Sequence, residues 1–491
     1  MADEKINTDE NVQVNDANDT NASDKSRHEE RQQNKGGLSH VGMIFACGAA
    51  LFSDGYVNAI SGPVGSILKR LYQAEDEKRF IHFKKLFSSL GFAGTVIGML
   101  VFGYLTDRVG RKFGMLFASI WLSIFCILSA LAWGAGGSID GLFSALIAFR
   151  FIQGIAIGAE YPAGSVACSE STESAGVNKK RQQMYFSLAT HTMLDLGFLV
   201  AHFVPLVLVW IFGMNHLKVV WRLSLGLGAV PPLSLLYARA KMQEPIHYRK
   251  SSIRFAQMPW WLIVKRYWLR LAAVSIAWFI YDWISYPASV FADYIIIQVL
   301  PTDASFQANL GWGVVINLFN LPGSLVGALV NDRLGPKYTM ILGLIVQAVI
   351  GFSLAGGYAL LKAHIGAFVV LYGLFLSAGE FGPGNNLGLL ASKATGPTAV
   401  RGICYAIAAA LGKCGAFGPF NIGSALALLS AATIFLFVPN VGEDSMLIED
   451  IEFKRYLEAN GFDTSTMGIE ASKSSVETGV PQSPASEVET S

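Results

Sequence analysis

A single carboxylate, Asp282, lies in a long apolar stretch between two aromatic residues at four-residue spacing, Trp278 and Tyr286. A charged side chain in the middle of a membrane helix costs about 2.5–3.5 kcal/mol on insertion scales, so such a residue is usually retained for a function. Steps of four residues advance by about 40° around a helix, which places all three side chains on one face. An acid between two hydrogen-bonding aromatic side chains predicts a site that binds a proton and a polar solute together.

Other polar residues also lie within apolar stretches, and each of them needs a partner there. Arg150 and Glu160 are separated by about 15 Å along one predicted helix, so we expect both to find partners on other helices. Arg150 either holds helices together through backbone carbonyls or takes part in the site. His191 and Asp195 are one helical turn apart and could form a packing pair. We expect Lys413, in a later apolar stretch, to be functional for the same reason as the acid above.

The composition is that of a membrane protein. The chain has 491 residues, of which 52% are hydrophobic and 15% charged, and apolar runs of nearly membrane-spanning length recur along it. Its net charge of +1 gives no reason to expect a nucleic acid partner. The cysteines lack metal-ligand spacing, and no glycine-rich nucleotide loop or nucleophile elbow is present. We therefore expect a lipid-embedded protein that is not an enzyme and that needs neither a cofactor nor a metal ion.

The apolar segments divide the chain into two parts around a polar, basic stretch. Apolar spans lie near 41–62, 86–106, 113–134, 141–164, 184–212, 219–240, 268–298, 309–330, 338–360 and 366–391. The predicted organisation is a disordered cytosolic tail (1–38), a bundle of six helices (39–240), a cytosolic loop (241–266), a second helix bundle (267–439) and a disordered tail (440–491).

Basic residues in the loops predict that the N-terminus is cytosolic. Lys and Arg are concentrated in the loops after the second, fourth and sixth spans, which the positive-inside rule places in the cytosol. The loop after the first span disagrees, because it contains Lys69, Arg70, Lys78 and Arg79. The majority of the loops nevertheless indicates an N-terminus inside the cell.

The last apolar region is unusually short. Only about 38 residues separate Gly402 from Pro439, and two full spans with a turn need more than about 40. Either spans 11 and 12 form a very short hairpin, or much of span 11 and its outer loop is missing. The second interpretation is preferred. With one span left, the tail after 439 would lie outside the cell, although its acidic, Ser- and Thr-rich composition is typical of a cytosolic tail.

A motif that occurs twice relates the two parts of the chain. Gly103-Tyr-Leu-Thr-Asp-Arg-Val-Gly-Arg-Lys112 follows span 2, and Gly327-Ala-Leu-Val-Asn-Asp-Arg-Leu-Gly-Pro-Lys337 follows span 8. Such an offset of six spans is typical of a parallel repeat. Both copies resemble the loop signature of the major facilitator superfamily. This resemblance implies an all-α membrane protein of two six-helix bundles, here with 11 or 12 transmembrane helices, and gating or structural roles for Asp107, Arg108, Arg111, Arg150, Asp332 and Arg333.

Within that superfamily, the chain resembles the phosphate:proton symporter branch. The similarity rests on the Trp278–Tyr286 stripe, on Glu160-Tyr161 and on Leu411-Gly-Lys-Cys-Gly415. The branch usually has Asp in place of Glu160 and a glutamine in span 5, which is absent here. These departures make the chain more similar to the fungal glycerophosphodiester permeases, which import glycerophosphoinositol or glycerophosphocholine. Matching segments are Gly158–Ala167, Trp221–Gly228 and Tyr456–Met467.

The resemblance implies a multi-pass, monomeric symporter of the plasma membrane that imports a glycerophosphodiester together with protons. The implied substrate-binding residues are Tyr161, Trp278, Asp282, Tyr286, Asn386 and Lys413. The implied proton-coupling residues are Asp54, Glu160 and Asp282. Tyr281 and Trp283 could contact a choline headgroup, although helix packing is the preferred interpretation of both.

Two alternatives stay open at this point. One is a symporter for inorganic phosphate or another organic anion. The other is a family member that does not transport, either degenerate or receptor-like. The short span 11 favours the second alternative, because in the family this helix lines the pore, and it carries Lys413.

Overall fold

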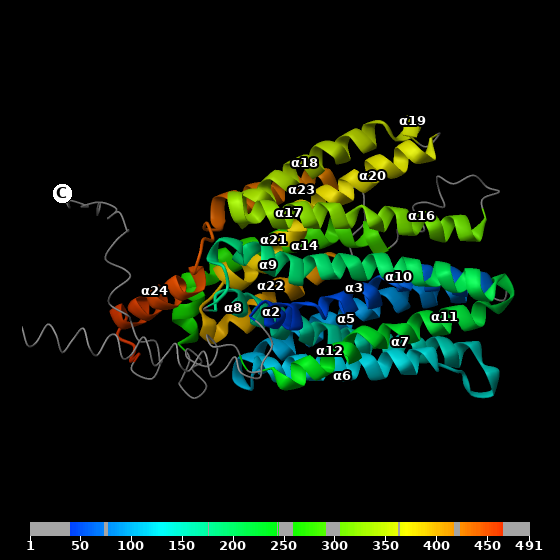
Figure 1. Cartoon of the computed structure of the whole chain (residues 1–491), viewed down its shortest axis with the longest axis horizontal. Helices are drawn as coiled ribbons and strands as arrows, with labels where there is room; N and C mark the ends of the chain where they lie inside the picture. The colour runs from blue at the N-terminus through cyan, green and yellow to red at the C-terminus, as the bar shows by residue number, and fades with distance from the viewer. Residues whose placement is uncertain are drawn as a thin grey trace, which may run out of the picture.

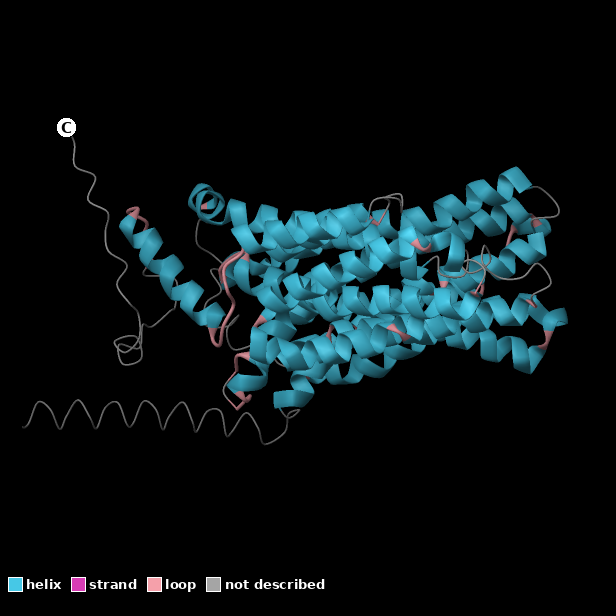
Figure 2. Ribbon diagram, turned by 90° about the horizontal axis from the view of Figure 1, so that it is seen from above, coloured by secondary structure: helices cyan, strands magenta, loops and turns pink. Residues whose placement is uncertain are grey.

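The computed structural model is a bundle of long helices that run roughly along its longest axis (Figures 1 and 2). It describes residues 40–72, 77–174, 176–242, 244, 259–290, 305–361, 364–416 and 423–464, and this part of the chain is helical without strands. Nine of its helical segments are long and apolar enough to cross a membrane. The predicted all-α fold is thereby confirmed.

The first half of the chain supplies six spans, several of them interrupted. Their helices are α2 (His40–Gly48), α3 (Leu51–Ala59), α4 (Ser61–Tyr72), α5 (Glu77–Arg108), α6 (Arg111–Ala130), α7 (Ile139–Glu160), α8 (Val166–Thr172), α9 (Gln182–Ala189), α10 (His191–Phe212), α11 (Leu217–Gly226) and α12 (Val230–Lys241). Within this half, α5 packs along α7 and α3 packs along α10.

The second half repeats the pattern with shorter final helices. It contains α14 (Trp260–Val290), α16 (Phe306–Leu318), α17 (Asn320–Leu334), α18 (Pro336–Gly356), α19 (Tyr358–Leu361), α20 (Ile365–Gly379), α21 (Asn385–Ala394), α22 (Arg401–Gly415), α23 (Gly423–Phe437) and α24 (Ser445–Ala459). The two halves meet where α5 lies along α22 and α10 lies along α16.

Small residues allow α5 and α7 to approach closely. A Cβ atom on Gly154 would lie 2.1 Å from the carbonyl oxygen of Gly91, and one on Gly158 would lie 2.3 Å from that of Thr95. Gly94 faces the carbonyl of Phe151 in the same way. Helices in a membrane associate largely through such close packing. These contacts hold α7 in place, and α7 leads directly into the functional region.

Each half has a π-helical segment in its fourth span. In the first half it is η2 (Tyr161–Ser165), which contains Pro162, and in the second half it is η6 (Glu380–Gly384), which contains Pro383. A proline removes one backbone donor and disturbs the helical hydrogen-bond pattern, and π-helical segments occur frequently at functional sites. These two segments therefore mark equivalent positions in the two halves.

The end of the second half is shortened, as expected. Both α22 and α23 are present, each with 15 residues, so each is about 22 Å long against a hydrocarbon thickness of about 30 Å. The half-length α22 fits the expectation that much of span 11 is missing, but a second short helix, α23, follows it, so the described residues contain two helices here and not one. Residues 417–422, which join the two helices, lie outside the described residues. Lys337 at the start of α18 lies 5.5 Å from the ring of Phe435, so α23 returns to the end of the bundle where α18 begins.

The segment after α23 is also more ordered than expected. The predicted disordered tail (440–491) contains α24, which lies across that same end of the bundle (Figures 1 and 2). Its buried residues are Met446, Asp450, Phe453 and Leu457, which share one helix face. The predicted loop 241–266 likewise ends too late, because α14 already begins at Trp260. The predicted tail 1–38 lies outside the described residues.

Glu449 is expected to hold α24 against α14. Burial by itself raises the pKa of this carboxyl, but a hydrogen bond from the Tyr267 hydroxyl and the guanidinium groups of Arg270 and Arg266 outweigh it and hold the pKa below its ordinary value. The carboxylate therefore stabilises docking at neutral pH and loses this contribution as the pH falls through the lowered pKa. In Glu449→Gln, we expect amide exchange in α24 to rise by about tenfold, measured by mass spectrometry.

The control for this experiment is Glu452→Gln. The Glu452 side chain is 53% exposed and contacts Arg266 at 3.1 Å, so its loss should change exchange little. Equal exchange in α24 for the Glu449 variant and the unmodified protein would show that Glu449 does not hold the helix.

Candidate functional site

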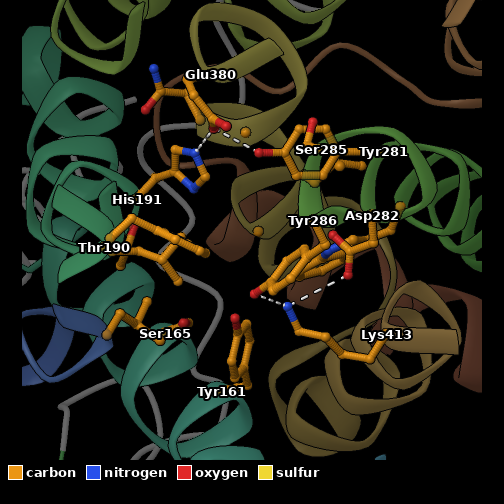
Figure 3. A pocket seen from close by; sticks show the side chains of 18 of the residues that line it. Tyr161, Ser165, Thr190, His191, Tyr281, Asp282, Ser285, Tyr286, Glu380 and Lys413 are labelled. Atoms are coloured by element: carbon orange, nitrogen blue, oxygen red, sulfur yellow. Dashed lines mark hydrogen bonds and ion pairs between the residues drawn. The ribbon is translucent and has the colours of Figure 1, made fainter. Parts of the chain in front are cut away.

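A small cavity lies between the two halves of the bundle, at the depth of the two π-helical segments (Figure 3). Its volume is about 50 Å³, which is room for a few water molecules at about 10–15 Å³ each. Five of the six predicted substrate-binding residues line it, namely Tyr161, Trp278, Asp282, Tyr286 and Lys413. The stripe on α14 therefore faces the cavity, as its four-residue spacing predicts.

Lys413 is held by aromatic rings and one acid. Its ammonium group donates a hydrogen bond to the Tyr286 hydroxyl and lies 3.8 Å from the centre of that ring and 5.1 Å from the ring of Tyr161. The nearer oxygen of Asp282 is 3.5 Å away, and neither oxygen of that carboxyl has a hydrogen-bond partner among the described residues. Both charged side chains are almost completely buried. The Asp282 carboxyl can therefore still form hydrogen bonds with a ligand in the cavity.

Asp54 does not line the cavity, but it is hydrogen-bonded to a residue that does. One oxygen of its carboxylate accepts a hydrogen bond from the Tyr161 hydroxyl, and the other accepts one from the Asn58 amide. Tyr161 itself lines the cavity, so its hydroxyl links Asp54 to the space around Lys413. This arrangement is compatible with the predicted role in proton coupling.

Glu160 has a different environment from the other predicted coupling acids. Both of its oxygens bind the guanidinium of Arg239 on α12, one of them at 2.7 Å. Arg239 also donates to the backbone oxygens of Ala46, Cys47 and Met115, and it is fully buried. The charge of an acid in a two-bond pair of this kind is balanced by the guanidinium, so the geometry supports a structural role that joins four spans.

We expect Glu160→Gln and Arg239→Gln each to reduce the amount of folded protein strongly, because removing one partner of a buried ion pair costs about 3–5 kcal/mol. The double variant should lose less than the sum of the two single variants. Surface abundance and elution as a single species from size-exclusion chromatography measure the effect. If Glu160→Gln were folded at normal abundance but inactive, Glu160 would instead be a proton-coupling residue.

Two further predicted residues lie away from the cavity. Arg150 donates to the backbone oxygen of Val57 and lies 5.2 Å from the ring of Phe87, so it holds helices together through a carbonyl. Asn386, a predicted substrate ligand, is fully buried and donates to the oxygen of Gly382 at 2.7 Å. Its neighbour Asn385 lines the cavity instead, because successive residues on a helix point about 100° apart.

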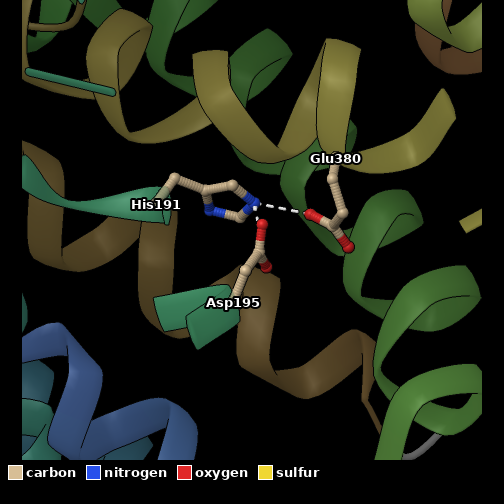
Figure 4. A group of neighbouring side chains, drawn as sticks. All are labelled: His191, Asp195 and Glu380. Atoms are coloured by element: carbon tan, nitrogen blue, oxygen red, sulfur yellow. Dashed lines mark hydrogen bonds and ion pairs between the residues drawn. The ribbon is translucent and has the colours of Figure 1, made fainter. Parts of the chain in front are cut away.

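A cluster that the sequence only partly indicated lies at another side of the cavity (Figures 3 and 4). Glu380, at the start of η6, accepts a hydrogen bond from the Tyr281 hydroxyl at 2.6 Å and pairs with His191 Nε2 at 2.5 Å. His191 and Asp195 face each other at 3.8 Å, so they are neighbours as expected, but the closer partner of His191 comes from the opposite half. Trp283, by contrast, packs on Phe279 with ring centres 5.5 Å apart.

The residue types of this cluster also suit a metal ion. Ligand atoms of His191, Asp195 and Glu380 all lie within 4.8 Å of one another (Figure 4). However, the Glu380 oxygen that faces His191 already accepts the Tyr281 hydroxyl. Hydrogen bonds within the protein thus account for these contacts without an ion.

The two loop motifs close one end of the bundle in matching ways. Asp107 accepts hydrogen bonds from the backbone N–H groups of Gly402 and Ile403, at 3.0 and 2.8 Å, in the first turn of α22. Asp332 accepts one from the N–H of Met184, at 3.0 Å, in the first turn of α9. Each acid therefore caps the positive end of a helix in the opposite half. Such contacts must break before this end can open.

Buried ion pairs reinforce the same closure. Glu170 lies 3.2 Å from Arg111 of its own half and 3.4 Å from Arg401 of the other half. The remaining predicted gating residues lie at the periphery: Arg108 is 5.7 Å from the ring of Tyr104, and Arg333 is exposed at the same end. The motif acids and Arg111 thus make the contacts that close this end.

Comparisons with known proteins agree with this architecture. A family model described as "Sugar (and other) transporter" matches residues 42–254 and 264–439. The chain is 44% identical over 466 residues to a glycerophosphocholine permease of Candida albicans, which covers 90% of this chain and 86% of the relative. It is 43% identical over 452 residues to the major glycerophosphoinositol permease of that organism, with 86% and 83% covered.

A solved structure shares the fold at low sequence identity. The proton:xylose symporter XylE, bound to 6-bromo-6-deoxy-D-glucose, superimposes with a TM-score of 0.71 at 16% identity, over 84% of this chain and 98% of that chain. The chain is therefore a multi-pass membrane protein of the sugar (and other) transporter family in the major facilitator superfamily, and it belongs there with the fungal glycerophosphodiester permeases.

Proposed function

We propose that the protein is a monomeric, proton-coupled symporter of the plasma membrane, with its N-terminus in the cytosol, that imports glycerophosphodiesters. Glycerophosphocholine and glycerophosphoinositol are the candidate substrates, since relatives at 44% and 43% identity are permeases for these two compounds. The observation that carries the proposal is the buried Lys413 on the cavity wall, held by Tyr286 and a partly unsatisfied Asp282.

This arrangement suits a phosphodiester, which carries one negative charge. Lys413 supplies one cation, and the Tyr286 hydroxyl, which accepts a hydrogen bond from Lys413, keeps its own proton to donate beside it. Binding of the anion separates Lys413 from Asp282. Two anions side by side in a poorly solvated cavity repel each other, so the substrate binds when Asp282 carries a proton.

Release follows from the same interaction in reverse. When Asp282 loses its proton to the cytosol, its carboxylate competes with the phosphodiester for Lys413 and expels the substrate. Asp54 supports the transfer, because Tyr161 connects it to the cavity. Proton and substrate then cross in the same direction, as a symporter requires.

The structure has one closed end and only a small cavity, so it corresponds to one state of the transport cycle. A cavity of about 50 Å³ is too small for a glycerophosphodiester, so the two halves must move apart to admit one. The contacts of Asp107 and Asp332 with the opposite halves close one end, which leaves the other end for entry. Although α22 is short, it still places Lys413 in the cavity, so its length does not remove the site.

The test is uptake of labelled glycerophosphocholine, glycerophosphoinositol and phosphate by yeast that lacks its own carriers for them, with surface expression measured alongside. We expect uptake of a diester that rises as the external pH is lowered and that stops when a protonophore is added. Uptake of phosphate alone would contradict the assignment of substrate. A lack of any uptake at normal surface expression would contradict transport of these compounds.

A further inference from the structure

We propose that the side of the cavity formed by Glu380, His191 and Tyr281, with Asp195 behind the imidazole, is a headgroup subsite that selects a quaternary ammonium group. On this basis glycerophosphocholine is the preferred substrate and glycerophosphoinositol a poorer one. The inference rests on the proposed function and extends it to the choice of headgroup.

The cavity has two separate groups of charged side chains (Figure 3). In one, Lys413 is paired with Asp282. In the other, Glu380 faces His191, and Asp195 lies 3.8 Å behind the imidazole. Two carboxyl groups face one imidazole there, so this region contains more acidic groups than basic ones. A cation in the substrate would restore the balance of charge.

The hydrogen bonds of this region favour a cation without donors. Glu380 Oε2 already accepts the Tyr281 hydroxyl and faces His191 Nε2. A trimethylammonium group needs no hydrogen bond and interacts through charge alone. The inositol ring, in contrast, carries many hydroxyl groups, and each of them must replace a hydrogen bond to water with one to the protein. Here the main acceptor and the Tyr281 donor are already in use.

Aromatic side chains surround the same space. Trp278, Tyr281, Phe198 and Tyr405 all line the cavity, and the rings of Trp278 and Tyr405 meet edge to face with centres 5.6 Å apart. Aromatic faces attract quaternary ammonium groups, and this attraction is stronger where water is excluded. The combination of aromatic rings with carboxylates thus suits a choline headgroup.

Unsatisfied polar atoms indicate that a ligand completes this region. The Ser285 hydroxyl lines the cavity beside Tyr281, is 4% exposed and has no hydrogen-bond partner among the described residues. Asp195 Oδ2, at 1% exposure, lacks one as well. Buried polar atoms without partners are unusual in folded proteins. A ligand with glycerol hydroxyls would give the Ser285 hydroxyl its missing partner, while an ammonium group on the same ligand would balance the charge of the nearby carboxylates.

The net charge of the two diesters leads to the same preference. Glycerophosphocholine is a zwitterion, so its phosphate can pair with Lys413 while its ammonium group faces Glu380. Glycerophosphoinositol brings only a negative charge, which Glu380 and Asp195 repel unless they bind protons. The two substrates should therefore differ in affinity and also in how steeply uptake depends on pH.

The experiment measures uptake of both labelled diesters by the unmodified protein, Glu380→Gln and Glu380→Asp, with mutual competition. We expect the unmodified protein to prefer glycerophosphocholine, and Glu380→Gln to lower its uptake efficiency by about tenfold or more while changing that of glycerophosphoinositol by less than about threefold. Glu380→Asp keeps the charge and should keep the preference. Glu443→Gln, an exposed acid at the closed end, is the matched control.

Several outcomes would overturn the inference. A preference of the unmodified protein for glycerophosphoinositol would do so while leaving the proposed function intact, and this readout does not depend on any variant folding. An equal loss of both substrates in Glu380→Gln would assign Glu380 to proton coupling or to folding instead. Uptake of neither diester by the unmodified protein would overturn the proposed function and this inference together.

Discussion

Replacing Lys413 with methionine is expected to lower the efficiency of glycerophosphodiester uptake by about 100-fold or more. Methionine fills similar space without the charge, so the phosphodiester loses the cation that faces it in the cavity. Removing one partner of a buried charge pair costs about 3–5 kcal/mol, and each tenfold change in rate corresponds to about 1.4 kcal/mol. The measurement is the initial uptake rate as a function of substrate concentration, corrected for the amount of protein at the cell surface.

The matched control for this variant is Lys218→Met. Lys218 is exposed on α11, so its loss should leave uptake unchanged within about twofold. A Lys413→Met protein that reached the surface and transported at a normal rate would show that the phosphodiester binds elsewhere.

Replacing Asp282 with asparagine is expected to abolish proton-driven accumulation while leaving substrate binding largely in place. Asparagine has the shape of a protonated carboxyl but cannot release a proton. The substrate should therefore still reach Lys413, but nothing expels it towards the cytosol. In whole cells we expect net uptake to fall by about 100-fold or more, and the apparent affinity of the residual exchange activity to lose its dependence on pH.

Asp140→Asn is the control, because the Asp140 side chain is 65% exposed and pairs only loosely with Arg79 at 3.3 Å. Exchange of labelled for unlabelled substrate across the membrane of reconstituted vesicles separates binding from coupling. Accumulation in Asp282→Asn at the rate of the unmodified protein would exclude Asp282 as the coupling acid.

The central part of the site could be predicted because it depends on local periodicity. Trp278, Asp282 and Tyr286 share a face by helix geometry alone, and the cost of burying a charge marks both Asp282 and Lys413. The same criterion also applies to Glu380, which follows the apolar run of α20 in the sequence. A search for isolated acids in every apolar stretch would have found it.

Other features depend on contacts that sequence spacing does not encode. Glu160 and Arg239 are far apart in the chain, and they pair because α7 and α12 both pack on α6, where the Arg239 side chain reaches Glu160. The choice between Asn385 and Asn386 depends on the rotation of α21 after the π-helical segment η6. Successive residues on a helix point about 100° apart, so Asn385 lines the cavity and the predicted Asn386 does not.

The arrangement of the final two helices could not be predicted from the sequence either. Counting residues showed that the region from Gly402 to Pro439 is short for two full spans. It did not show that two half-length helices, α22 and α23, would both pack on α14. In α24, the buried positions Met446, Phe453 and Leu457 are separated by charged residues, so composition alone indicated a disordered tail.

The most direct test of proton-coupled import is transport by the purified protein in sealed lipid vesicles with an imposed pH gradient. The vesicles contain labelled glycerophosphocholine at the same concentration inside and outside, and the exterior is made more acidic. We expect the unmodified protein to accumulate the substrate inside, and the Asp282→Asn protein only to exchange it. If the concentrations stayed equal across the membrane despite the gradient, while exchange remained active, the protein would be a facilitator rather than a symporter.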